Sequence, residues 1–176
     1  MLWAQSRFFN LIESEKQAFK SSSFSKGCAA SSDYDVKYYC CYWNMDPTLT
    51  AISGNVAMHF KTLSAIDSLQ MDISIAMTID SVHYQGSKIT FLQQTGDVLG
   101  IKFPASISSN VTDSLKVYYH GFPGATGFGS FVQATHGVNA DPVLWTLSEP
   151  YGAKDWWPCK QTLDDKADSI DIFVTV

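Results

Sequence analysis

Histidine is the first side chain to test for chemistry in this sequence, because imidazole serves both as a metal ligand and as a general acid or base. The histidines have no second histidine or carboxylate at the helical spacing of a metal site. The sequence also lacks an H-E-x-x-H motif, a G-x-S-x-G motif and a phosphate-binding glycine loop. His59 and His83 occupy polar positions in alternating segments, and His120 ends another such segment. We therefore interpret these three histidines as solvated or hydrogen-bonded surface residues.

Cysteine is the second candidate, with Cys28, Cys40, Cys41 and Cys159 in the chain. Four cysteines are too few for a disulfide-built fold of this length, and there is no C-x-x-C pair to indicate a structural zinc site. Because Cys40 and Cys41 are neighbours, they point to opposite faces of a strand and do not share one metal or one partner. We interpret one of the two as a small buried apolar residue. A single disulfide bridge that includes Cys159 stays an open alternative.

The most unusual stretch of the sequence is the segment 144–160, which contains three of the five tryptophans. Within it, Glu149 lies beside Pro150 and close to Gly152, which predicts a bend among aromatic residues. A carboxylate that is desolvated in such a bend can bind a cation, such as the α-ammonium group of a peptide. The alternative is a solvated turn glutamate beside tryptophans that belong to the core. The composition of the segment leaves both interpretations open.

The elements that must position these residues are predicted from a two-residue period that begins at Tyr34. Turn-forming residues, such as Asp46-Pro47 and Gln85-Gly86-Ser87, separate the alternating segments. Half-buried strands at this spacing, without helical periods between them, predict an all-β fold over residues 33–176. We expect an antiparallel β-sandwich or one large curved, saddle-like sheet. The alternating segments are residues 52–60, 69–73, 77–84, 89–91, 101–103, 115–119 and 170–176.

The first 32 residues have a different pattern. Residues 1–5 are either the remnant of a signal peptide or simply the start of the chain. In residues 6–20, Phe8, Leu11 and Ile12 follow the i, i+3, i+4 spacing of a short amphipathic helix. Residues 21–32 are rich in Ser, Ala and Gly, which is typical of a linker. At the other end, the alternation continues to Val176, so we expect the chain to be a piece of a longer protein.

The composition excludes several classes of function. Lys and Arg number 12 against 17 Asp and Glu, a net charge of −5, so the chain lacks the basic balance of a nucleic-acid-binding protein. No apolar run approaches the roughly 20 residues of a membrane-spanning helix. Hydrophobic residues make up 45% of the chain and charged residues 16%, against roughly 25% charged residues in an average soluble domain. This composition suffices for a folded core and favours a periplasmic or secreted β-protein.

Several segments together resemble one family of proteins. Residues 146–162 (TLSEPYGAKDWWPCKQT) and 167–176 (ADSIDIFVTV) are similar to the end of the N-terminal domain in the aminopeptidase N family of zinc peptidases, including its leukotriene hydrolase branch. Residues 34–39 (YDVKYY), 52–60 (ISGNVAMHF) and 115–121 (LKVYYHG) resemble earlier strands of the same domain. The resemblance covers residues 34–176, and the order and spacing of the segments make it more specific than any single one.

The resemblance implies that the full-length protein is a zinc-dependent aminopeptidase, which removes N-terminal residues from peptides. In this family a saddle-like N-terminal domain packs on a thermolysin-like catalytic domain. That catalytic domain carries the H-E-x-x-H zinc site, its general base and a Gly-x-Met-Glu-Asn loop for the free amine of the substrate. None of these motifs occurs in the chain. We therefore expect the zinc ligands to lie beyond Val176, and this fragment alone to be inactive and without a metal or cofactor of its own.

The resemblance also implies a role for Glu149. Members of the family carry Gln-x-Glu or Gln-x-Gln on a loop of the N-terminal domain, which reaches into the active site and holds the substrate amine. Glu149 occupies the second position of this motif, whereas Leu147 stands where Gln is expected. The expected partners are thus the N-terminus of a peptide and the missing catalytic domain, with Glu149 as the substrate-binding residue.

A second hypothesis is a secreted β-sandwich module that binds carbohydrate or protein through a platform of exposed Trp and Tyr side chains. Trp156 and Trp157 disfavour it, because neighbours in a strand face opposite ways and do not form one flat surface. Under the first hypothesis we expect a bacterial protein that is periplasmic or secreted.

Overall fold

The structure is a computed structural model that describes residues 32–176, except residues 125–128, 150 and 163. The N-terminal helix at residues 6–20, the linker up to residue 31 and the signal-peptide remnant at residues 1–5 lie outside the described residues, so they stay predictions. In the part of the chain that is described, no helix has the length and apolar character needed to cross a membrane.

The described residues are mainly β-structure with one short 3₁₀ helix, η1 (Ala153–Asp155), and the all-β prediction is confirmed. The two-residue period of the sequence therefore predicts most of the strands, but it does not predict the two strands within residues 131–146. The strands are β1 (Tyr34–Met45), β2 (Ile52–Thr62), β3 (Ile66–Asp72), β4 (Met77–Tyr84), β5 (Ser87–Ile89), β6 (Phe91–Gln94), β7 (Val98–Ile107), β8 (Thr112–Gly121), β9 (Phe131–His136), β10 (Asp141–Thr146) and β11 (Ser169–Thr175).

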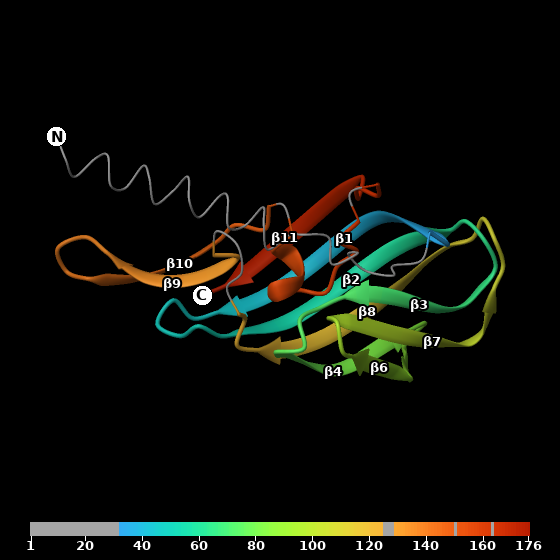
Figure 1. Ribbon diagram of the computed structural model, residues 1–176, viewed down its shortest axis with the longest axis horizontal. Coiled ribbons are helices and arrows are strands. Elements are labelled where there is room, and N and C mark those ends of the chain that lie inside the picture. Colours follow the sequence, from blue (N-terminus) through green and yellow to red (C-terminus); the bar gives the residue numbers. More distant parts are fainter. Residues whose placement is uncertain (1–31, 125–128, 150, 163) are drawn as a thin grey trace.

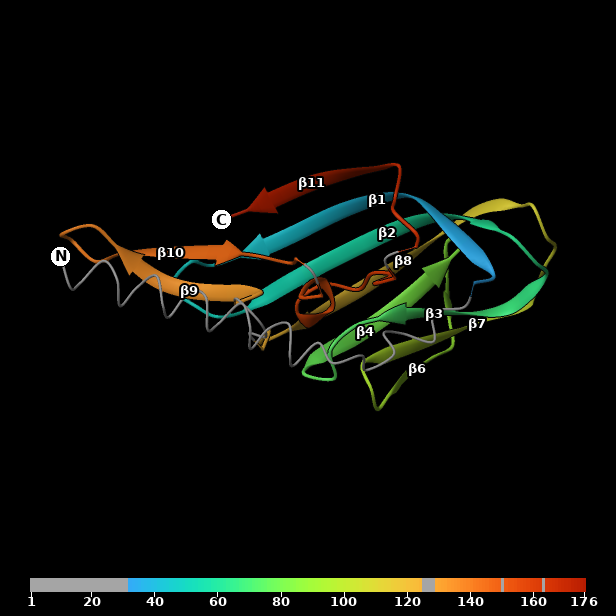
Figure 2. The ribbon, with the colours of Figure 1, turned by 45° about the horizontal axis from the view of Figure 1, so that its top comes forward.

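The strands form three sheets (Figures 1 and 2). A long, curved six-stranded sheet has the order β11-β1-β2-β8-β4-β5, and a three-stranded sheet has the order β3-β7-β6. Strands β9 and β10 form a separate hairpin, which projects beyond one end of the large sheet. The core lies between the two larger sheets, where the rings of Phe60 on β2 and Phe103 on β7 stack with centroids 6.1 Å apart.

Strand β2 shows how the alternation builds this core. Val56, Met58 and Phe60 are buried, whereas the residues between them are half-buried on the opposite face. Full burial of such side chains stabilises the fold by about 1.5–3 kcal/mol each. Tyr34 of β1 meets Phe60 edge-on, and its hydroxyl donates a 2.6 Å hydrogen bond to the carbonyl of Gln70 on β3. The tyrosine thus joins the large sheet to the small one.

The fold departs from the antiparallel alternative of the prediction in one place, because β11 pairs with β1 in parallel, with Ile172 opposite Cys41. Alternation predicts which face of a sheet a residue occupies but says nothing about the direction of its strand. A parallel pair needs a long crossover connection rather than a tight turn. Here the chain between β10 and β11 returns through η1 and the residues that follow it.

The neighbouring cysteines of β1 occupy opposite faces as predicted, with Cys41 buried and Cys40 half-buried. Burial raises the pKa of the Cys41 thiol to about 12, so at pH 8 only about one Cys41 in ten thousand is a thiolate. We expect iodoacetamide at pH 8 to modify Cys40 well before Cys41, and Cys41 to react once urea unfolds the protein. Peptide mass spectrometry measures both rates, and equal rates in the folded protein would contradict the burial.

Candidate functional site

Glu149 lies in the turn that follows β10 and precedes η1, and its side chain is exposed to solvent. The turn is closed by a 2.7 Å hydrogen bond from the amide of Gly152 to the carbonyl of Ser148. Within this chain the carboxylate is therefore solvated, contrary to the interpretation that the bend desolvates it. Two tryptophans of this segment, Trp156 and Trp157, pack toward β1 instead.

The packing of these tryptophans is visible in their ring contacts. Trp156 and Trp157 follow η1, and both lie against Trp43 of β1, with ring centroids 4.7 and 6.0 Å away. Trp157 also meets Tyr39 edge-on at 5.1 Å. The expectation that the pair faces opposite ways is wrong, because the two residues do not belong to a strand. Their contacts with β1 agree with a core role and remove the pair as the exposed stacking platform that carbohydrate binding would use.

The turn is anchored on both sides of Glu149. Before it, Ser148 Oγ accepts a 3.1 Å hydrogen bond from the indole N–H of the buried Trp156. After it, Gly152 approaches Ser130 so closely that an added Cβ would lie 2.7 Å from the Cβ of Ser130. The place of Glu149 is therefore set by the aromatic core and by the residue that precedes β9.

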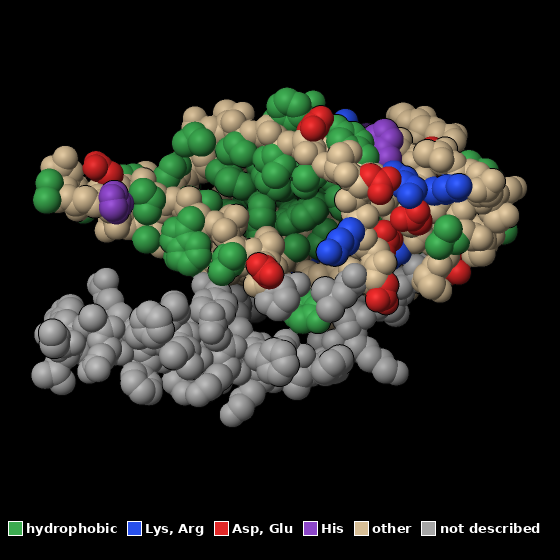
Figure 3. All heavy atoms as spheres, turned by 90° about the horizontal axis from the view of Figure 1, so that it is seen from above, with side chains coloured by type: hydrophobic (Ala, Val, Ile, Leu, Met, Phe, Trp, Pro, Cys, Tyr) green, Lys and Arg blue, Asp and Glu red, His purple; other side chains and the backbone are tan. Residues whose placement is uncertain are grey.

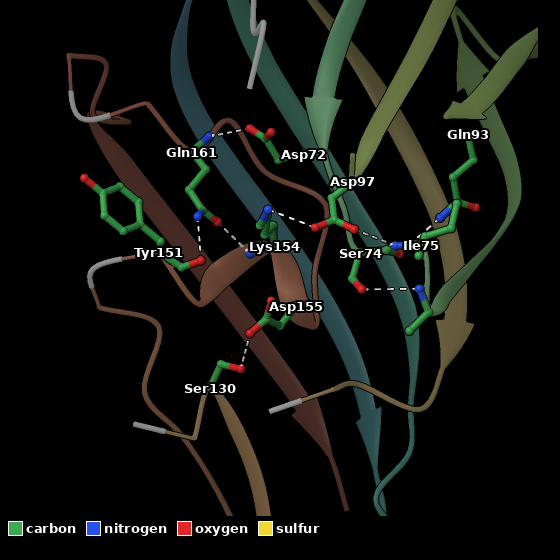
Figure 4. A network of polar contacts seen from close by, with 11 residues as sticks. Asp72, Ser74, Ile75, Gln93, Asp97, Ser130, Tyr151, Lys154, Asp155 and Gln161 are labelled. Carbon is green, nitrogen blue, oxygen red and sulfur yellow. Dashed lines mark hydrogen bonds and ion pairs between the residues drawn. The ribbon is translucent and has the colours of Figure 1, made fainter. Parts of the chain in front are cut away.

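A polar network fixes η1 against the loops that precede β4 and β7 (Figure 4). Lys154 Nζ lies 2.9 Å from Asp97 Oδ2, and the carbonyl of Lys154 accepts a 2.8 Å hydrogen bond from the amide of Ser74. Burial alone would lower the pKa of Lys154, but the hydrogen bond and the charge of Asp97 outweigh burial, so this pKa lies above its usual value. Asp97 also accepts a 3.0 Å hydrogen bond from the amide of Ile75. The 3₁₀ helix after Glu149 is thus held by side chain and backbone together.

An apolar hollow of about 500 Å³ borders the turn of Glu149. Ser148, the residue that precedes Glu149, is part of its lining. Hydrophobic side chains gather on this face of the molecule (Figure 3), and Trp145 and Ile172 remain 44% and 51% exposed. A contiguous apolar surface of this kind is typical of an interaction site. The hollow is lined by Trp43, Met45, Leu144, Trp145, Thr146, Ser148, Trp156, Trp157, Ile170, Ile172 and Val174.

The histidines of the large sheet lie apart from this site. They occupy the face of the sheet that points away from the core. His120 is exposed with its Nδ1 2.9 Å from a carboxylate oxygen of Asp80, while His59 and His83 are half-buried beside tyrosine rings. These positions agree with the interpretation as surface residues. Among the described residues, no group of three or more His, Cys, Asp or Glu side chains is arranged to hold a metal ion. The described residues therefore do not form the zinc site that the resemblance implies for the full-length protein.

Comparison with known proteins identifies the architecture. The sequence pattern of the peptidase M1 N-terminal domain matches residues 31–172. The fold is similar to that of an M1 zinc metallopeptidase from Deinococcus radiodurans, at 18% identity and a TM-score of 0.66, over 82% of this chain and 33% of that one. It is also similar to native leukotriene A4 hydrolase from Saccharomyces cerevisiae, at 20% identity and a TM-score of 0.67, over 93% of this chain and 27% of that one. A search of curated proteins finds no match.

The chain thus spans about a third of the length of the first structure and about a quarter of the second. Because both identities are low, these two structures establish the fold alone. The match of the domain pattern, in contrast, extends over most of the sequence and includes the turn of Glu149. On this evidence, the chain belongs to the family of peptidase M1 N-terminal domains.

Proposed function

We propose that this chain is the N-terminal, non-catalytic domain of a zinc-dependent aminopeptidase, which removes N-terminal residues from peptides. In this proposal the domain covers the active-site cleft of a catalytic domain outside the chain, and Glu149 binds the α-ammonium group of the substrate. The observation that carries the proposal is the place of Glu149, an exposed carboxylate on an anchored turn whose preceding residue, Ser148, lines an apolar hollow.

The apolar hollow supports a partner on this side of the domain. Strand β11 forms the edge of the six-stranded sheet, and its Ile170, Ile172 and Val174 are 44–51% exposed. Removing apolar surface from water yields about 25 cal/mol per Å², so a partner that covers these side chains gains a substantial driving force. We infer that the catalytic domain covers this surface and thereby excludes water from the surroundings of Glu149.

The carboxylate of Glu149 would act through its charge. Once a partner excludes water, a hydrogen bond between carboxylate and ammonium is stronger than it is in solvent. Only a peptide with a free N-terminus carries the α-ammonium group, so Glu149 aligns the first residue of the substrate for cleavage. The zinc ion and the groups that act on the peptide bond belong to the proposed catalytic domain. This chain by itself is therefore inactive in the proposal.

Leu147 makes the proposed site less polar than the family motif leads us to expect. Its side chain is 40% exposed and lies two residues before Glu149, where the resemblance leads us to expect Gln. Leucine offers no hydrogen bond to an ammonium group, so the polar contact from this domain rests on Glu149. We propose that Leu147 instead contributes an apolar wall beside the first residue of the substrate.

The proposal predicts how the full-length protein discriminates between peptides. It is expected to release the first residue from a peptide with a free N-terminus and to leave the N-acetylated form of the same peptide uncleaved. A zinc chelator should abolish the activity and added zinc should restore it. Mass spectrometry of the products measures both effects. Equal cleavage of the acetylated peptide, or activity that survives chelation, would refute the assignment as a zinc aminopeptidase.

A further inference from the structure

We propose that Gln161 is a positioning residue for Glu149, because its side-chain amide ties the turn of Glu149 to the folded core. The inference rests on the proposed function of Glu149 and identifies the residue that holds the carboxylate where the substrate amine meets it. Gln161 follows the tryptophan-rich segment and lies twelve residues after Glu149 in the sequence. Figure 4 shows its side chain extending toward Tyr151 and Lys154.

Three hydrogen bonds place Gln161 between the turn and the core. Its Nε2 donates to the carbonyl of Tyr151 at 2.5 Å, and its Oε1 accepts from the amide of Lys154 at 2.9 Å. Its own backbone amide donates to Asp72 Oδ2 at 2.8 Å. The carboxamide thus uses its donor on the turn that carries Glu149 and its acceptor on the 3₁₀ helix η1.

The groups to which Gln161 is bonded are themselves held by the core, which makes Gln161 an anchor. Asp72 is 2% exposed at the end of β3, and its backbone exchanges two hydrogen bonds with Cys159, of 2.7 and 3.0 Å. Lys154 is held by Asp97 and by the amide of Ser74. Gln161 therefore links the carbonyl of Tyr151 to the three-stranded sheet and its loops, and so fixes where that carbonyl lies.

Glu149 lies between two fixed points of the turn. Ser148, on one side, is bonded to the indole of Trp156, and Tyr151, on the other, is bonded to Gln161. The glutamate side chain itself stays exposed between them. A binding group that is held in place in advance loses less conformational freedom when the ligand arrives. Releasing Tyr151 should therefore weaken amine binding without changing the carboxylate.

The substitution Gln161→Glu separates the bond to the turn from the other two. A glutamate retains an acceptor for the amide of Lys154, and the backbone bond to Asp72 is untouched. It replaces the donor that faces Tyr151 with a carboxylate oxygen, which repels the carbonyl. In the full-length protein we expect KM for a free-amine peptide to rise about three- to tenfold, the loss of one hydrogen bond, with kcat within about twofold.

Two further variants keep this test independent of general destabilisation. Gln161→Met removes donor and acceptor without adding charge, and we expect an increase in KM at least as large. Thr62→Val is the matched control. Thr62 is the last residue of β2, and its hydroxyl donates a hydrogen bond to the carbonyl of Ser108 and accepts one from the amide of Val111. The substitution should lower the free energy of unfolding and leave KM unchanged.

The decisive measurement is a double-mutant cycle with Glu149→Ala. If Gln161 acts through Glu149, Gln161→Glu raises KM in the natural background and has no further effect in the Glu149→Ala background. A clear effect of Glu149→Ala together with none of Gln161→Glu would overturn the positioning role and leave the proposed function intact. An equal effect of Gln161→Glu in both backgrounds would also overturn it. If Glu149→Ala alone changes nothing, the proposed role of Glu149 in amine binding fails and the positioning role fails with it.

Discussion

Replacing Glu149 with alanine in the full-length protein is expected to lower kcat/KM for peptides with a free N-terminus about ten- to hundredfold. This loss corresponds to about 1.4–2.7 kcal/mol, the range of a hydrogen bond to a charged group. Most of the change should appear as a higher KM, because the carboxylate binds the amine before and during the reaction. Steady-state kinetics with one peptide series measures both constants.

The same substitution should leave the fold intact, which makes the kinetic result interpretable. Glu149 is exposed in a turn, and substitutions at such positions usually change the free energy of unfolding by less than about 0.5 kcal/mol. Asp141→Ala is the matched control, because it removes another exposed carboxylate, at the start of β10. Glu149→Gln retains the size of the side chain and an acceptor, so it should fall between the natural protein and Glu149→Ala. Unchanged kinetics in Glu149→Ala would exclude Glu149 from the substrate site.

The parts of this fold that the sequence predicts are those governed by local periodicity. In β2, the buried Val56, Met58 and Phe60 follow directly from the alternation of apolar and polar residues. The opposite faces of Cys40 and Cys41 follow in the same way. Each of these statements concerns which side of its own strand a residue occupies, and local geometry is enough to decide it.

The parts that the sequence does not predict depend on contacts between distant segments. Strand β11 is parallel to β1, and no local pattern in residues 169–175 encodes that direction. Trp156 packs on Trp43, more than a hundred residues earlier, so the segment turns its rings inward and leaves Glu149 in solvent. The positioning role of Gln161 could not be predicted from the sequence, because it too depends on a contact with a distant segment. A single glutamine carries no motif, and its anchor Asp72 lies 89 residues away.

Lys160 gives the largest expected effect on stability, because it is a buried cation that holds the chain leading to β11. Its Nζ lies 2.5 Å from Asp165 Oδ2 and 2.6 Å from the carbonyl of Tyr34, and it sits 4.2 Å from the centroid of the Tyr34 ring. The side chains of Lys160 and Asp165 are only 5% and 11% exposed. Asp165 also accepts a 3.1 Å hydrogen bond from the amide of Val36. The pair therefore fastens the segment before β11 to the start of β1.

Lys160→Met is expected to lower the free energy of unfolding by about 3–5 kcal/mol, because it leaves the carboxylate of Asp165 buried without its cation. Methionine replaces the apolar stem, so lost packing contributes little. Lys102→Met is the control, since Lys102 pairs with Asp67 at the surface with 58% and 62% exposure, and its loss should cost less than about 1 kcal/mol. Urea unfolding of the two variants measures the difference. If both lose the same stability, the buried pair does not hold the segment, and β11 owes its place to its pairing with β1 alone. A larger loss in Lys160→Met, partly recovered by adding Asp165→Asn, would instead show that the buried charge fixes the edge strand on which the apolar hollow depends.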